Sequence, residues 1–166
     1  GLHLCPVAQL QQADLLVIFS GFIEFHPTQD SLRRRSQLIL KQMLSQLQVK
    51  PEVVLNTFKA KCYHPLVYQP AADASKTPYD LALLTQDLDN LDTSMINVED
   101  LKQIPDIVIL HGAQDQIVSP QQGHRLWQQL PNSQLIEIPD AGHALPFTHF
   151  QTCLSVLHAS HAAYFS

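Results

Sequence analysis

The sequence predicts an α/β fold in which a mostly parallel sheet is interrupted by a helical insertion. Two continuous apolar runs, over residues 14–21 and 105–112, have the composition of strands covered on both faces of a parallel sheet. Between them, apolar residues recur at intervals of three and four, which is the period of amphipathic helices. Strands that alternate with helices favour a parallel sheet between helical layers.

The other elements are expected from periodicity and from the prolines and glycines at their ends. In chain order, we expect a short helical segment over 1–12, helices over 30–47, 51–62 and 79–89, a loop over 64–78, a helix over 120–130, a short strand over 134–138 and a final helix over 147–165. The chain is thereby divided into a core segment (1–27, a helix and a strand), a helical insertion (28–100) and a second core segment (101–166).

Composition excludes several classes of function. A formal charge of −5 and a pI near 5.9 give no basic excess that would attract nucleic acid. No run approaches the roughly 20 apolar residues that a membrane span requires. Cys5, Cys62 and Cys153 are widely spaced and odd in number, so we expect no disulfide framework and a reducing, cytoplasmic location. Nine histidines without paired spacing predict no metal site, and no organic cofactor is expected.

Two loops that follow expected strands carry ionisable residues. Asp115 follows the strand over 105–112, and His143 follows the strand over 134–138 directly after Gly142. Catalytic groups collect at the carboxyl ends of parallel strands, and a hydrolytic triad needs a carboxylate that orients an imidazole. Asp115 and His143 meet that placement. Taken singly, Asp115 is better explained as the cap of a turn or helix, and His143 as a solvated loop residue.

The two loops together resemble the C-terminal part of α/β-hydrolase-fold enzymes. The segments HGAQDQIVSP (residues 111–120) and IPDAGHA (residues 138–144) carry the resemblance, which is close over 105–166 and looser over 13–104. It implies that Asp115 is the triad acid, that His143 is the general base, and that residues 28–100 form the cap over the active site. The order of the triad in this family is nucleophile, acid, histidine.

No nucleophile of the family type is present in the sequence. The family places it in a G-x-S-x-G elbow, which this chain lacks, so the resemblance implies a missing N-terminal half that carries the nucleophile and the oxyanion loop. Ser20 lacks the first glycine and lies on the wrong strand, Ser119 is better explained as a helix cap, and Cys5 and Cys62 as buried helix residues. An open sheet edge would make the chain associate with that missing half or with itself.

Within the family, the layout most resembles carboxylesterases that act on pimeloyl-[acyl-carrier protein] methyl ester in biotin synthesis. The similar features are the size of the cap, the segment LDNLD (residues 88–92) and the segment AGHALPF (residues 141–147). Arg33, Arg34 and Arg35 would then form a basic face that steers an acidic carrier protein, although arginines on a solvated helix need no such role. The alternatives are a truncated or split non-catalytic chain, and a dehalogenase or epoxide hydrolase with an aspartate nucleophile.

Overall fold

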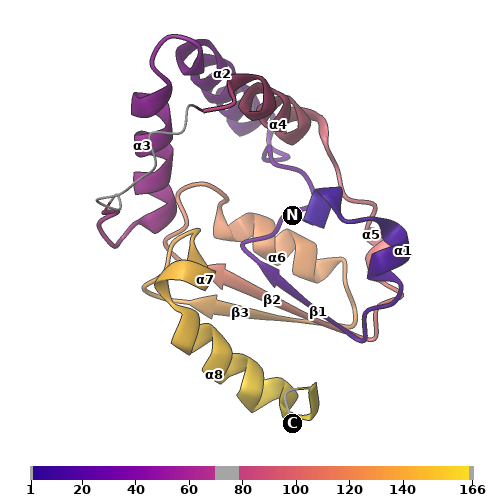
Figure 1. The fold of residues 1–166 in the computed structure, drawn as a ribbon. Coiled ribbons are helices and arrows are strands. Elements are labelled where there is room, and N and C mark those ends of the chain that lie inside the picture. Colours follow the sequence, from indigo (N-terminus) through magenta and orange to yellow (C-terminus); the bar gives the residue numbers. More distant parts are fainter. Residues whose placement is uncertain (1, 70–78, 165–166) are drawn as a thin grey trace.

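A parallel sheet forms the centre of the computed structural model, which describes residues 2–69 and 79–164 (Figure 1). Within those residues the sheet has three strands, β1 (Leu15–Phe19), β2 (Asp106–Gly112) and β3 (Ser133–Ile138), in the order β1-β2-β3. Leu16 is in register with Ile107, and Ile109 with Leu135. The predicted parallel α/β sheet is confirmed.

The position of β2 at the centre of the sheet explains why its apolar residues do not alternate with polar ones. Ile107 and Ile109 point to one face of the sheet, where they pack with Leu126 of α6 (Pro120–Gln128). Val108 and Leu110 point to the other face, where they pack with Leu157 of α8 (Phe150–His161). A strand that helices cover on both faces has no polar side, so consecutive residues are all apolar.

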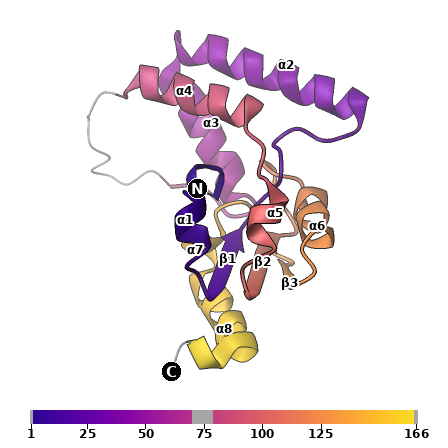
Figure 2. The same cartoon turned by 90° about the vertical axis from the view of Figure 1, so that its right-hand side faces the viewer.

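Helices cover both faces of the sheet (Figure 2). The short helices α1 (Val7–Leu10) and α5 (Val98–Leu101) share the core of α6, to which they contribute Leu10 and Leu101. The short helix α7 (Leu145–Thr148) shares the core of α8. One-turn 3₁₀ helices lie near the two ends, at Leu2–Leu4 and Ala162–Tyr164. No helix of the described segments combines the length and the apolar composition that a membrane crossing needs.

The outer edge of β1 carries no neighbouring strand among the described residues. Leu16 and Val17 are only half-buried there, and Phe19 is 36% exposed, whereas their partners in β2, Ile107, Val108 and Leu110, are fully buried. A row of unpaired backbone groups beside apolar side chains is a surface that another strand would cover.

Three long helices follow β1 and precede β2 in the sequence. In space they arch over the carboxyl ends of the strands (Figures 1 and 2). They are α2 (Asp30–Leu47), α3 (Pro51–Tyr63) and α4 (Leu81–Thr93). The expected bounds of α2 and the proline at the start of α3 are confirmed. Helix α4 begins two residues later than expected because Asp80 is its N-cap, whose side chain accepts a hydrogen bond from the Leu83 N–H at 2.9 Å.

The two ends of this insertion are joined to each other and to the core. Glu24 and Met95 form an antiparallel bridge, and the Ile96 N–H donates to the carbonyl of Ile23 at 2.9 Å. Glu24 also forms ion pairs with Arg33 of α2 and Arg125 of α6. Burial raises the pKa of Glu24, but the hydrogen bonds from the two arginines outweigh it and hold that pKa below its usual value. A single carboxylate therefore connects the insertion to α6.

The structure corrects several expected elements. The final helix does not run over 147–165: α7 and α8 are separate, because His149 between them has a non-helical backbone (φ −131°, ψ 35°). The helical segment over 1–12 is divided into a 3₁₀ turn and α1, with Cys5 in the turn between them, and α5 was not expected. Residues 64–69 contain no helix or strand, whereas the rest of the expected loop, 70–78, and the end of the expected last helix, 165, lie outside the described residues.

Candidate active site

Asp115 lies in the turn that follows β2, and a close approach of two loops places it beside His143. Gly112 at the end of β2 makes this approach possible: a Cβ atom there would lie 2.2 Å from the carbonyl oxygen of Gly142 and 2.4 Å from that of Ala141. The Asp115 N–H then donates to the carbonyl of Gly112 at 3.1 Å, which closes the turn. The glycine in the HGAQD segment is therefore required by the contact between the loops.

The side chain of Asp115 is fully buried, and each carboxylate oxygen has a separate task. Oδ1 accepts the backbone N–H groups of Ile117 at 2.8 Å and Val118 at 2.9 Å, which shapes the start of α6. Oδ2 accepts from Nδ1 of His143 at 2.8 Å. The two interpretations drawn from the sequence, a turn cap and a partner of His143, thus hold together for one side chain.

Donors around Asp115 keep it ionised. Burial alone raises the pKa of the carboxyl, but hydrogen bonds from His111 and His143 and from the Val118 N–H, with the charge interaction of His143, hold that pKa well below its usual range. Nε2 of His111 lies 3.0 Å from the carbonyl oxygen of Val118, so it carries a proton, and 3.4 Å from Oδ2 of Asp115. A buried charge of this kind is stable only when such partners surround it.

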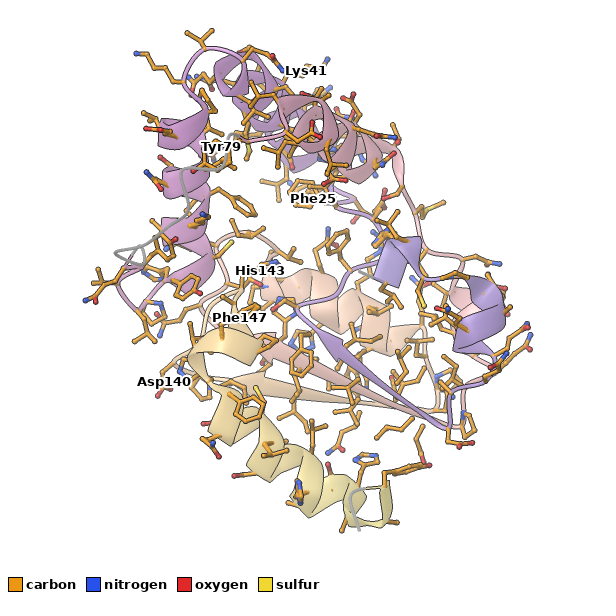
Figure 3. All side chains as sticks on the ribbon, in the orientation of Figure 1. Phe25, Lys41, Tyr79, Asp140, His143 and Phe147 are labelled. Carbon is orange, nitrogen blue, oxygen red and sulfur yellow. The ribbon has the colours of Figure 1, made fainter. Side chains whose placement is uncertain are left out.

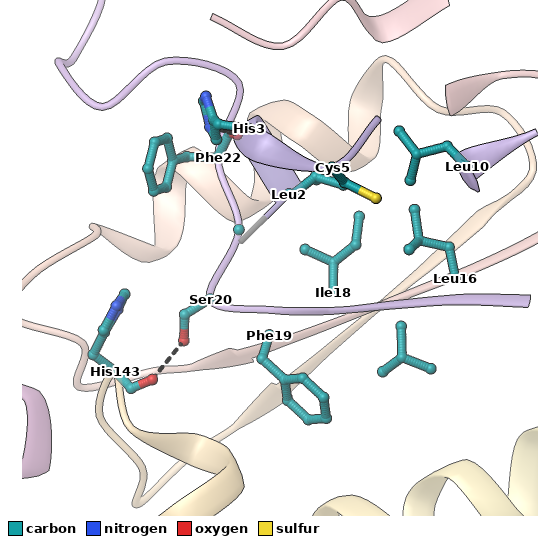
Figure 4. A pocket seen from close by; sticks show the side chains of 12 residues that line it. Leu2, His3, Cys5, Leu10, Leu16, Ile18, Phe19, Ser20, Phe22 and His143 are labelled. Carbon is teal, nitrogen blue, oxygen red and sulfur yellow. Dashed lines mark hydrogen bonds between the residues drawn. The ribbon is translucent and has the colours of Figure 1, made fainter. Parts of the chain in front are cut away.

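His143 is held at one ring nitrogen and open at the other. Its side chain is 27% exposed, and Nδ1 is engaged with Asp115. Among the described residues, none forms a hydrogen bond with Nε2. Two cavities reach this ring: one of about 510 Å³ along the outer side of β1 (Figure 4), and one of about 350 Å³ between α3 and the His143 loop. Nε2 is therefore the ring nitrogen that could accept a hydrogen bond from a bound molecule.

The backbone of the His143 loop is clamped from two sides. The hydroxyl of Ser20, at the end of β1, donates to the carbonyl of His143 at 3.1 Å (Figure 4). On the other side, the N–H of Ala144 donates to the carbonyl of Cys62 at the end of α3 at 2.9 Å. Gly142 packs so tightly here that a Cβ atom would lie 1.8 Å from the carbonyl oxygen of His64. The insertion helix α3 thus takes part in holding the histidine.

Ser20 has a strained backbone. Its φ of 49° lies in the left-handed region, which is unusual for a residue other than glycine, and the residue is 3% exposed. The hydroxyl meets the backbone carbonyl of His143 and not the imidazole, so its position is that of a support for the loop. Strain of this kind persists where the surrounding contacts determine it.

The remaining nucleophile candidates are also placed by the structure. Ser119 occupies the N-cap position of α6, but its hydroxyl bonds to the side chain of Gln121 and makes no cap bond. Cys62 is buried beside the His143 loop, where burial and the charge of Asp115 raise the pKa of its thiol to about 11. Its neutral form is therefore favoured. Cys5 is half-buried in the turn before α1.

Two histidine contacts were not assigned from the sequence. His111 is placed four residues before Asp115, which is the only signal of its role. His26 is 2% exposed and joins Ser36 of α2 (2.8 Å) to Asp92 of α4 (2.7 Å), and nothing in the spacing of these residues indicates the contact. Over residues 2–69 and 79–164, no group of three or more His, Cys, Asp or Glu side chains is arranged to hold a metal ion.

The three arginines of the expected basic face differ in their surroundings. Arg33 is engaged with Glu24, whereas Arg34 and Arg35 are exposed on α2. Helix α2 lies at the end of the molecule farthest from the sheet (Figure 1). The structure therefore leaves two of the three guanidinium groups accessible at a distance from His143.

Comparison with known proteins points to one family. The family model described as alpha/beta hydrolase fold matches residues 14–150, which is more than half of the chain. No curated protein sequence matches significantly.

Similar solved structures include an esterase from Exiguobacterium antarcticum (TM-score 0.67, 13% identity, 89% of this chain and 56% of that chain). A bromoperoxidase from Bacillus anthracis (0.60, 17%, 86% and 56%) and an alpha/beta hydrolase enzyme from a Medee basin deep-sea metagenome library (0.56, 17%, 92% and 60%) are similar as well. At these identities the similarity shows the fold alone. The chain spans less than two thirds of the length of each of these structures.

Replacing the buried carboxylate by an amide tests the Asp115 network. Asp115→Asn leaves one oxygen for donors that now use two, so we expect a loss of about 1–3 kcal/mol in the free energy of unfolding at neutral pH. Because the folded pKa of Asp115 is lowered, the stabilisation is complete above the unfolded value of about 3.9 and is lost as the pH falls through the folded pKa. Urea unfolding over a pH series should show a constant difference in the free energy of unfolding between the variant and wild type near neutral pH. This difference should become smaller in acid. A difference that widens in acid would contradict the network.

A matched pair of substitutions tests the role of Ser20. Ser20→Ala keeps the left-handed strain and loses the hydroxyl, whereas Ser20→Gly loses the hydroxyl and relieves the strain. We expect the glycine variant to be more stable than the alanine variant by about 1 kcal/mol in urea unfolding. Hydrogen exchange in the loop over 139–145 should be faster than wild type in both. An alanine variant as stable as the glycine variant would show that the strain is absent.

Proposed function

The chain belongs to the α/β-hydrolase fold family, and on that premise we propose that Asp115 and His143 are the acid and the general base of a serine carboxylesterase. The observation that carries the proposal is the 2.8 Å hydrogen bond from Nδ1 of His143 to the buried carboxylate of Asp115. It fixes the proton on Nδ1 and leaves Nε2, on the accessible side of the ring, as the base.

The chemistry follows from that tautomer. Nε2 takes the proton of a serine hydroxyl as its oxygen attacks the ester carbonyl, and the ionised Asp115 stabilises the imidazolium that forms. The imidazolium returns the proton to the leaving alcohol, and an acyl-enzyme results. Water, deprotonated by the same nitrogen, then releases the acid and the serine, while backbone N–H groups stabilise the oxyanion.

The serine of this mechanism is proposed to lie outside the sequence, in an N-terminal half of the fold. The sequence contains no G-x-S-x-G, and the outer edge of β1 is unpaired among the described residues. A further strand on that edge would continue the parallel sheet and cover the apolar groove beside Ser20 and His143. Self-association through the same edge is the alternative partner. In this proposal residues 28–100 are the cap, and residues 1–27 and 101–166 belong to the core.

A finer proposal concerns the substrate, the methyl ester of pimeloyl-[acyl-carrier protein] in biotin synthesis. Arg34 and Arg35, exposed on α2, provide positive charge on a chain whose formal charge is −5, and charge complementarity would steer an acidic carrier protein to the cap. A cytoplasmic setting is part of the proposal, since Cys5, Cys62 and Cys153 are all free thiols.

A fluorophosphonate probe tests the proposed triad. The protein is isolated with every polypeptide that copurifies with it, and the labelled residue is identified by mass spectrometry. We expect label on a serine outside residues 1–166, and His143→Ala should slow labelling by about a thousandfold or more, because the base is lost. His124→Ala, at an exposed histidine of α6, is the matched control and should label at the wild-type rate.

Two other results would overturn the proposal. Label on a serine within residues 1–166 would show that the proposed position of the nucleophile is wrong. Absence of label, or labelling that does not depend on His143, would favour the split non-catalytic chain or an aspartate nucleophile.

Charge reversal on α2 tests the carrier-protein contact. Arg34→Glu and Arg35→Glu should each weaken binding of an acyl carrier protein by about threefold to tenfold, more at low salt, because attraction becomes repulsion. Hydrolysis of p-nitrophenyl esters, which carry no carrier protein, should be unchanged. Lys102→Glu makes the same change of charge beyond α5 and should leave binding unchanged; an equal loss in this control would reduce the effect to net charge.

A further inference from the structure

Among the described residues, the cavity between α3 and the His143 loop has apolar walls and a single ammonium group. Its volume is about 350 Å³, and its walls include Phe19, Tyr63, Pro146 and Phe147. His143 lines one part of it and Lys59 another, and none of the described residues that line it is a carboxylate. Apolar walls with one or two polar groups are typical of sites that bind small molecules.

Helix α3 sets the separation between these two groups. Its last turn is fixed to the His143 loop by the hydrogen bond from the Ala144 N–H to the Cys62 carbonyl. Figure 3 shows the end of α3 beside His143 and Phe147. Lys59 precedes Cys62 by three residues, so it lies on the same face about one helical turn, ~5 Å, further from the loop. An acyl chain of a few methylene groups spans that length.

Lys59 is available to a ligand. Within the described part of the chain, no carboxylate forms an ion pair with it. Its Nζ lies 5.7 Å from the centre of the Tyr68 ring, which in turn packs edge-on against Tyr63 at 5.0 Å. The aromatic ring directs the ammonium group without neutralising its charge.

The two ends of the cavity differ in sign. Asp115 is bonded to His143 and supplies negative charge at the His143 end. Cys62 lies at the same end, where burial and then the charge of Asp115 raise the pKa of its thiol. Lys59 supplies positive charge at the other end. An elongated ligand with one anionic end would therefore place that end at Lys59 and its neutral end at His143.

We propose that this cavity binds the acyl chain of a monoester of a dicarboxylic acid, with the ester at His143 and the free carboxylate bound by Lys59. The inference rests on the proposed esterase function, and it goes further by assigning a substrate class and a specificity residue. This substrate is a free monoester and is an alternative to the carrier-bound ester, whose far end is a thioester and offers Lys59 no carboxylate. A neutral ester of the same length would fill the same apolar walls and lack the ion pair.

Two ligands that differ only at the far end test this site. Adipamic acid and hexanamide are both six-carbon amides. The far end of adipamic acid is a carboxylate, whereas that of hexanamide is a methyl group. Neither ligand contains an ester that could be cleaved. By NMR titration of the full chain, we expect adipamate to bind about threefold to tenfold more tightly than hexanamide, with a smaller preference at high salt. The amides of residues 143–147 should shift with both ligands.

Substitutions in α3 test whether Lys59 causes the preference for adipamate. Lys59→Met keeps the apolar stem and should abolish the preference without changing hexanamide affinity, and Lys59→Gln should do the same. Lys61→Met, two residues along α3 and outside this cavity, should retain it. Equal affinity of the two ligands for wild type, a preference that survives Lys59→Met, or no saturable binding of either ligand would overturn the inference.

The test of the anion site at Lys59 can be distinguished from the test of the proposed esterase triad. The amide ligands report the site without a nucleophile, so a Lys59-dependent preference in a protein that hydrolyses no ester would overturn the esterase and keep the anion site. Ester hydrolysis with no such preference would overturn only the anion site.

Discussion

The ionised carboxylate of Asp115 is the contact on which the arrangement of the site depends. It is fully buried, and four donors converge on it: the backbone of Ile117 and Val118, His111 and His143. A charge removed from water destabilises the fold unless such partners replace the lost hydration. The same contact therefore fixes the turn after β2, the start of α6 and the orientation of the His143 ring.

The helical insertion is connected to this site by specific contacts. Glu24 links α2 to α6 through Arg33 and Arg125, and the end of α3 holds the backbone of the His143 loop through Cys62. Ser20 holds the same loop from the end of β1. A displacement of the insertion would thus move the histidine. In the proposed function, the position of the insertion would therefore affect the chemistry as well as the selection of substrate.

The sequence predicted those features that depend on local patterns. The run over 105–112 predicted β2 because both faces of that strand are covered, and the linked segments around Asp115 and His143 predicted their pairing because strand ends meet at one sheet edge. The break at His149, the left-handed Ser20 and the His26 contact with Asp92 were not predictable. The contacts of Ser20 and His26 join residues distant in sequence, which periodicity does not report.

The most direct test of the account is the protonation of His143 in the folded protein. Proton and nitrogen NMR of histidine labelled in the ring would resolve which nitrogen carries the hydrogen. We predict a protected, strongly downfield proton on Nδ1 of His143 that is lost in Asp115→Ala. A neutral ring with its proton on Nε2 and an exchanging, unprotonated Nδ1 would contradict it, because His143 would then be neither oriented by Asp115 nor able to act as a base toward the open cavity.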